Sequence, residues 1–425
     1  MISGIYPNSF PPALFCRFLV LVFLLGISGE AEAKKRKSKR KKSKRKVHYR
    51  TPTVPAIVPL ENAESAEFQN FIKKLQGLRN GKSEKVRMLI LGDSHMQCED
   101  FGTALNGFLG DSLGIPLAGR GFAFPYPLAR SNHRSDLSFG PKEGWHGCRF
   151  TRSDNRCEWG LAGWTAHMER DSADFFWKMK HRNFEAGDTV LLFSPPGSAR
   201  SHCLRMADSS GQAQNLEYDK SINAFRAIVP KRGPAMNFRI IRREPEKEFV
   251  LQGLLRKPQS PGLITGISGT NGARLDHYLL NPDFQKHMRE INPDLVLISL
   301  GTNDAFTRPF GPKEIQAFLS LLLARVKAAA PSAAILLAGP PDHCIRKGKP
   351  NPATEEVNRV FLQTAEELDF VFWNQQAAMG GRGSVFDWRC QNLSTPDLIH
   401  FSPAGYRKQA LLLFRSMEKH FSAKH

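Results

Sequence analysis

Apolar runs alternate with amphipathic segments in the first and last parts of the chain. Residues 86–91, with no charge after Arg87, and residues 294–300 are strongly apolar, which predicts strands buried on both faces of a parallel sheet. Because strands alternate with helices, we predict an α/β fold with a doubly wound parallel sheet. Further strands are predicted at 333–338 and 370–373, and helices at 61–80, 99–109, 312–330, 354–368 and 406–420.

The pattern between residues 131 and 261 is different. Short apolar runs at 189–193, 224–229 and 237–241 are separated by Gly, Pro, Asn and Asp, which is typical of an all-β sandwich. A segment of about 130 residues has the size of a separate domain. We therefore predict an inserted β-sandwich at 131–261, and an α/β domain in two parts at 61–130 and 262–425.

The N-terminal segment changes the expected location of the protein. Residues 18–27 are apolar and follow Arg17, and residues 31–33 (Ala-Glu-Ala) form a small-x-small cleavage site. The run is shorter than the roughly 20 residues that a membrane span needs, so residues 1–33 are predicted to be a secretory signal peptide. An uncleaved anchor is the alternative. We expect an exported protein of the periplasm or cell envelope.

A basic segment begins at Lys34 and ends at Lys46, with eleven Lys and Arg residues in thirteen positions, in a chain of formal net charge +20. Such dense like charge cannot bury a core, so residues 34–60 are predicted to be a disordered basic linker. In a cytosolic protein it would indicate nucleic-acid binding. Behind a signal peptide we expect anionic envelope polymers or lipid head groups as partners, and no nucleic acid. A solvated tail without a ligand is the alternative.

Cleavage after residue 33 would leave six cysteines. An even number in an exported protein permits disulfides. The first pairing that we expect is Cys148 with Cys157, nine residues apart around a polar turn. Cys344 and Cys390 follow predicted sheet-edge loops and are a candidate second pair. The six are Cys98, Cys148, Cys157, Cys203, Cys344 and Cys390.

Polar side chains follow the predicted strands at the edge where open α/β sheets place their sites. Ser94 comes after the first strand, and Asn303 comes after the second. Near the C-terminus Asp397 and His400 are three residues apart, a spacing that lets a carboxylate hold an imidazole in one tautomer. This set supplies a nucleophile, a base with its orienting carboxylate and an amide donor, and it requires no cofactor.

A glycine lets a ligand approach a backbone N–H closely, as an oxyanion donor requires, and Gly269 and Gly272 are both candidates. No metal site is predicted, because the chain has no His-Glu-x-x-His and its cysteines lack zinc-type spacing.

Two Asp-His pairs elsewhere could imitate the acid–base pair: Asp276 with His277, and Asp342 with His343. Adjacent side chains point in different directions, so neither carboxylate is well placed to orient its neighbour. His95, next to the nucleophile, is expected to shape the pocket.

Four blocks in this order resemble the SGNH/GDSL hydrolases, and more narrowly the peptidoglycan O-acetylesterases of that superfamily. The blocks are residues 92–95 (Gly-Asp-Ser-His), 119–128, 270–273 (Thr-Asn-Gly-Ala) and 301–304 (Gly-Thr-Asn-Asp). The resemblance implies an SGNH-hydrolase-like, flavodoxin-like sheet that a carbohydrate-binding-module-like β domain interrupts. It also implies Ser94 as nucleophile, a triad completed by Asp397 and His400, and Gly272 rather than Gly269 as an oxyanion donor.

The expected function is therefore an exported serine carbohydrate esterase that removes O-acetyl groups from peptidoglycan through an acetyl-serine intermediate. The oxyanion hole would consist of the N–H groups of Ser94 and Gly272 and the side-chain amide of Asn303. Two alternatives stay open: an esterase acting on another acetylated polysaccharide, and a non-catalytic protein that binds cell wall or polyanions. Hydrolysis and transfer of the acetyl group to another sugar also stay open.

Overall fold

The computed structural model describes residues 57–152, 157–207, 211, 213–345 and 348–422, and all of these belong to one compact unit. The predicted signal peptide and residues 34–56 of the predicted linker lie outside the described residues. No helix in the described part of the chain is long and apolar enough to cross a membrane.

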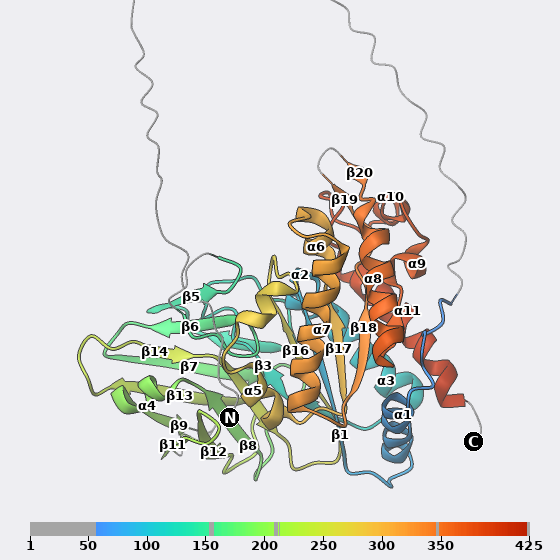
Figure 1. The fold of residues 1–425 in the computed structure, drawn as a ribbon. Helices are drawn as coiled ribbons and strands as arrows, with labels where there is room; N and C mark the ends of the chain where they lie inside the picture. Colours follow the sequence, from blue (N-terminus) through green and yellow to red (C-terminus); the bar gives the residue numbers. More distant parts are fainter. Residues whose placement is uncertain (1–56, 153–156, 208–210, 212, 346–347, 423–425) are drawn as a thin grey trace, which may run out of the picture. The chain divides into compact units, whose positions relative to one another are not determined.

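A parallel six-stranded sheet forms the centre of the α/β part (Figure 1). Strand β1 (Lys85–Gly92) pairs in parallel with β16 on one side and with β17 on the other. This sheet confirms the predicted α/β class and places the first predicted strand near its middle. Across the sheet the order is β2 (Leu117–Arg120), β16 (Gly262–Gly269), β1, β17 (Leu295–Ser299), β18 (Ala334–Ala338) and β21 (Val371–Trp373).

Helices cover the sheet according to the alternation of its side chains. Met88 and Ile90 of β1 belong to one hydrophobic cluster, whereas Leu89 and Leu91 belong to another. The first cluster contains apolar residues of α1 (Ala66–Arg79), α3 (Asp100–Leu113) and α11 (Pro403–Ser422), and the second those of α5 (Phe284–Ile291), α7 (Pro312–Ala329) and α8 (Ala353–Leu368). Because successive side chains of a strand point to opposite faces, both faces of the sheet are covered, as a doubly wound sheet requires.

Antiparallel strands form four further sheets in the described residues; three of them are built mainly from strands within residues 131–261, which is consistent with an inserted β domain. The predicted strand at 189–193 is β8 (Thr189–Phe193), and those at 224–229 and 237–241 are β12 (Ala224–Ile228) and β13 (Ala235–Arg242). Strand β3 (Phe122–Ala123) joins one of these sheets although it precedes residue 131. The predicted domain boundaries themselves stay predictions.

The strands of the antiparallel sheets are as follows. One sheet has the order β10 (Ala213–Asn215), β9 (His202–Ala207), β13, β7 (Ser172–Met179), β4 (Leu137–Gly140), and another has β11 (Glu217–Asp219), β12, β8, β15 (Gly253–Lys257), β3. The third has the order β14 (Phe249–Leu251), β6 (Trp164–Met168), β5 (Trp145–Arg149). The two-stranded sheet is β19 (Cys344–Ile345) with β20 (Lys349–Pro350). The short helices are α2 (Ser94–Gln97), α4 (Pro196–Ser201), η1 (Asp276–Leu280), α6 (Thr302–Thr307), α9 (Gln375–Met379) and α10 (Ser384–Cys390).

One predicted disulfide is confirmed and the other is wrong. Cys148 and Cys157 are bonded. Cys344 and Cys390 are free thiols, because Cys344 is buried in a hydrophobic cluster whereas Cys390 is exposed at the end of α10. Cys98 and Cys203 are also free, and burial, the largest influence on it, raises the pKa of the Cys98 thiol to about 12.

Candidate active site

A tight turn presents Ser94 at the carboxyl end of the central strand β1. The Asp93 carboxylate accepts a hydrogen bond from the His95 N–H at 2.9 Å and so caps the short helix that begins at Ser94. A Cβ atom at Gly92 would lie 2.5 Å from the Ser299 carbonyl oxygen, so this position requires glycine. The turn therefore gives Ser94 a fixed position at the edge of the sheet.

Three side chains form a continuous chain of hydrogen bonds. The Ser94 Oγ lies 2.9 Å from His400 Nε2, and His400 Nδ1 lies 2.8 Å from Asp397 Oδ2. Asp397 and His400 are brought together by a tight turn in which the intervening Leu398 has a positive φ of 58°. The i, i+3 spacing thus produces the acid–base pair that the sequence predicts, and Ser94 completes the triad geometry.

The surroundings of Asp397 favour its ionised form. Partial burial opposes ionisation, but hydrogen bonds from His400, from the Thr395 hydroxyl and from two backbone N–H groups outweigh it, and together they hold the pKa of Asp397 well below its usual range. In turn, the hydrogen bond to Asp397 raises the pKa of His400 above the usual histidine value, although burial opposes the rise. The carboxylate therefore stabilises the charged form of the imidazole.

The two candidate oxyanion glycines have different surroundings. The Gly269 N–H donates to the Tyr126 hydroxyl at 2.9 Å, and a Cβ at Gly269 would lie 2.4 Å from the Asp93 carbonyl oxygen. Gly269 is therefore a packing position whose donor is already used. Gly272 has a positive φ of 82°, lines the main cavity, and its N–H has no partner among the described residues. The geometry thus favours Gly272, in agreement with the sequence analysis.

Asn303, near the start of α6, directs its amide toward the same region. Its Nδ2 donates to the Ala273 carbonyl oxygen at 2.9 Å and makes a longer contact of 3.4 Å with Asp93 Oδ2. Because the second contact is long, that hydrogen is the one available to a ligand oxygen. The Ser94 N–H also has no partner in the described part of the chain.

These groups open into a cavity of about 710 Å³. The triad serine and histidine, Gly272 and Asn303 all line it. The other lining residues are both polar and apolar: Cys98, Asn132, His133, Arg134, Asn271, Thr302, Phe306, Thr395, Ile399, Phe401 and Tyr406. A cavity of this size is in the range of small-molecule sites, with room for a sugar residue.

Gln97 is a residue of this site that the sequence analysis missed. Its Oε1 accepts from the Asn271 N–H at 2.8 Å, while its Nε2 donates to Ser131 Oγ and to the Asn132 carbonyl oxygen. Gln97 thereby holds the turn that carries Gly272. No local pattern could have found it, because its partners lie far away in the sequence.

The inserted region supports the same turn from the other side. The Thr151 hydroxyl donates to the Asn271 carbonyl oxygen at 3.3 Å, and Arg149, the last residue of β5, reaches the same oxygen at 3.5 Å. The Asn271 N–H of this turn therefore donates to Gln97 in α2, and the Asn271 carbonyl oxygen accepts from two residues of the β region.

The alternative Asp-His pairs do not form acid–base pairs in the structure. The Asp342 carboxylate accepts backbone N–H groups at the start of α10, and Asp276 pairs with Arg274 at 2.7 Å. Among the described residues, neither carboxylate makes a hydrogen bond to the ring of the neighbouring histidine, His343 or His277. Both pairs have structural surroundings instead.

His95 is buried behind the triad rather than on the cavity wall. Its Nδ1 lies 3.0 Å from the Tyr406 hydroxyl, and its ring centroid is 5.5 Å from that of His400. Burial lowers the pKa of His95 well below the usual value, so the ring is neutral. It supports His400 by packing.

Comparison with known proteins agrees with this geometry. Residues 244–408 match the family model described as "GDSL-like Lipase/Acylhydrolase family". This part of the chain is therefore similar to the GDSL-like lipases and acylhydrolases. The matched residues include Asn303, Asp397 and His400 but begin after Ser94, which the fold brings to them at the start of α2, just after β1.

One solved structure shows the same fold. A structure described as "Peptidoglycan O-acetylesterase in action, 5 min" has a TM-score of 0.69 and 22% sequence identity, and the match covers 83% of this chain and 95% of the other. A family two carbohydrate esterase from Clostridium thermocellum is less similar, with a TM-score of 0.29, 12% identity, and coverage of 60% and 93%. No curated protein matches this chain in sequence.

Proposed function

We propose that this protein is an exported serine esterase that removes O-acetyl groups from peptidoglycan. The observation that carries the proposal is the hydrogen-bonded chain from Ser94 through His400 to Asp397, which opens into a cavity beside donors without partners among the described residues. Glycan as substrate is supported by the similarity in fold to a peptidoglycan O-acetylesterase.

The proposed reaction begins with proton transfer from Ser94. His400 Nε2 accepts the hydroxyl proton at 2.9 Å while Oγ attacks the carbonyl carbon of the acetyl ester. Asp397 stabilises the imidazolium and keeps the remaining ring proton on Nδ1. His400 then protonates the leaving sugar alcohol, and a water molecule attacks the acetyl-serine in the same way.

The negative charge that develops on the ester oxygen needs donors that the ground state leaves free. Among the described residues, the N–H groups of Ser94 and Gly272 meet this requirement, and the second amide hydrogen of Asn303 makes only a long contact of 3.4 Å with Asp93 Oδ2, which an ester oxygen can replace. Each is attached to a rigid element: the first to the start of α2, the second to the turn clamped by Gln97, and the third to α6. Such donors need no reorganisation during the reaction.

The proposal also includes the export of the protein and its binding to the cell envelope. An exported enzyme with a basic segment from Lys34 to Lys46 would be attracted to anionic envelope polymers or lipid head groups, which concentrates it near the wall. The dense positive charge of this segment suits an acidic polymer.

The test is the release of acetate from purified peptidoglycan. The proposal predicts release from O-acetylated peptidoglycan, none from the same material after mild alkaline removal of its esters, and slower release from acetylated xylan. Faster release from xylan would assign the enzyme to another polysaccharide. No release from any acetyl ester, including p-nitrophenyl acetate, would favour a non-catalytic wall-binding protein.

A further inference from the structure

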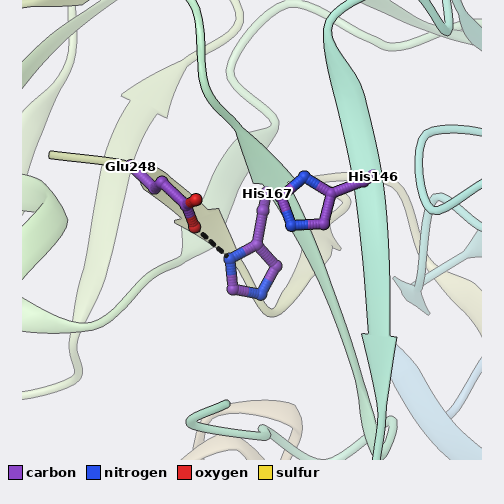
Figure 2. A group of neighbouring side chains, drawn as sticks. All are labelled: His146, His167 and Glu248. Atoms are coloured by element: carbon purple, nitrogen blue, oxygen red, sulfur yellow. Dashed lines mark hydrogen bonds and ion pairs between the residues drawn. The ribbon is translucent and has the colours of Figure 1, made fainter. Parts of the chain in front are cut away.

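Two histidines and a glutamate lie together at the three-stranded sheet of the β region (Figure 2), and none of them lines the cavity of the triad. His146 of β5 and His167 of β6 are directly paired across the two antiparallel strands, and Glu248 comes immediately before β14, the third strand. One possible ligand atom from each residue lies within 4.8 Å of those of the other two. Two strands of this sheet therefore supply one member each, and the residue just before the third strand supplies the other.

The residue types and distances suit a transition metal ion. Two imidazoles and a carboxylate are a common ligand set for Zn²⁺ when water takes the fourth position. Two atoms bound to one tetrahedral Zn²⁺ at about 2.1 Å lie roughly 3.4 Å apart. Glu248 Oε2 and His167 Nδ1 are already 3.0 Å apart. The side chain of His146 is 42% exposed, so its ring can rotate to bring the third atom to that distance.

An oxygen partner at the second nitrogen of each histidine ring also favours a metal site. The other nitrogen of His167, Nε2, lies 2.8 Å from the buried Thr165 hydroxyl, and His146 Nδ1 lies 3.1 Å from Glu169 Oε1. Histidine ligands of metals nearly always donate their second N–H to an oxygen in this way, which fixes the ring. His167 Nδ1 and His146 Nε2 are left to face the metal.

We propose that His146, His167 and Glu248 form a Zn²⁺ site that links the three strands of this sheet. On binding, Zn²⁺ takes the place of the proton between His167 Nδ1 and Glu248; this proton moves to Nε2 of the neutral ring, where it is donated to the Thr165 hydroxyl oxygen. Water fills the open position, because Glu248 and His146 face solvent.

The site would stabilise a sheet that reaches the active site. Strand β5 carries His146, continues through the disulfide-bonded Cys148, and ends at Arg149, whose side chain contacts the Asn271 carbonyl oxygen. A metal that joins β5 to its neighbours would therefore fix the position of Arg149, which contacts the turn that carries Gly272. This inference does not depend on the proposed esterase activity.

The test is calorimetric titration of the purified, metal-stripped full chain with Zn²⁺. We expect one ion per chain, and binding at least tenfold weaker in His146→Gln and in Glu248→Gln. Both side chains are substantially exposed, so both variants should fold, which circular dichroism verifies. His181→Gln, an exposed histidine elsewhere in the β region, is the matched control and should bind as the wild type does.

Thermal unfolding provides a second measurement. Zn²⁺ should raise the midpoint of unfolding of the wild type and of His181→Gln, but should have little effect on Glu248→Gln, because a ligand stabilises only a native state that binds it. Equal Zn²⁺ binding by the wild type and both site variants would place the ion elsewhere and overturn the proposal, as would the absence of binding by the wild type.

Discussion

Replacing Asp397 by Asn should trap His400 in the wrong tautomer. Asp397 Oδ1 accepts three hydrogen bonds, from Thr395 Oγ1 at 2.6 Å and from the backbone N–H groups of Ile399 and His400 at 2.9 and 3.0 Å. These donors can be satisfied only by an oxygen, so the new amide nitrogen must take the place of Oδ2, 2.8 Å from His400 Nδ1. An amide nitrogen donates, so Nδ1 becomes the acceptor and the ring proton moves to Nε2, facing Ser94.

The expected loss of activity in Asp397→Asn is large. With its proton on Nε2, His400 cannot accept the hydroxyl proton of Ser94, and the loss of the correct tautomer lowers kcat by roughly 10³–10⁴. The substitution also removes the negative charge of the Asp397 carboxylate, which attracts the protonated ring of His400. A unit charge about 4 Å away is worth about 1 kcal/mol in water and about 4 kcal/mol at an effective dielectric constant of 20. Because the side chains of Asp397 and His400 are 47% and 40% exposed, the lower end of this range applies.

The assay is the pH dependence of kcat/KM for a small soluble acetyl ester. In the wild type, neutral His400 is the base, so activity should rise with pH through a titration above about 6.5, since Asp397 raises the pKa of His400. In Asp397→Asn the residual activity should titrate at lower pH.

Asp276→Asn is the control, because Asp276 pairs with Arg274 and makes no hydrogen bond to His400. It should leave the profile unchanged. A shifted profile in Asp276→Asn together with an unshifted one in Asp397→Asn would refute the assignment of the base.

Three further predictions concern the oxyanion donors and the basic segment. Asn303→Ala should lower kcat by roughly 10²–10³ with little change in KM, and a pure KM effect would mean that Asn303 binds substrate instead. Gln97→Ala should lower kcat by about tenfold, the worth of one lost hydrogen bond to the Asn271 N–H, without moving the pH profile; unchanged kcat would show that the turn needs no clamp. Deleting residues 34–46 should leave turnover of a soluble ester intact but weaken salt-sensitive adsorption to sacculi, and equal adsorption by both forms would rule the segment out as the binding element.

The parts of the site that follow from local sequence could be predicted. A buried strand ending in Gly-Asp-Ser places a serine at the sheet edge, and an Asp three residues before a His produces a pair in one tight turn. The resemblance already points to Gly272 rather than Gly269, but the physical reason needs the structure, because the Gly269 N–H donates to Tyr126, a residue distant in the sequence.

Features that depend on distant packing were missed. Gln97 supports the oxyanion turn through residues 34 to 174 positions away. The pairing of Cys344 with Cys390 failed because only the folded chain shows that one thiol is buried and the other exposed. The His146, His167 and Glu248 cluster has no spacing signature, because its members come from three different strands.

Turnover of an acetyl ester by purified Ser94→Ala decides whether Ser94 is the nucleophile of an acetyl esterase. We predict that turnover falls to the level of the buffer while the thermal midpoint stays close to that of the wild type. The hydroxyl at the partly exposed Ser94 contributes only its hydrogen bond to His400, so its removal should hardly affect folding. Undiminished turnover by the folded variant would contradict the claim.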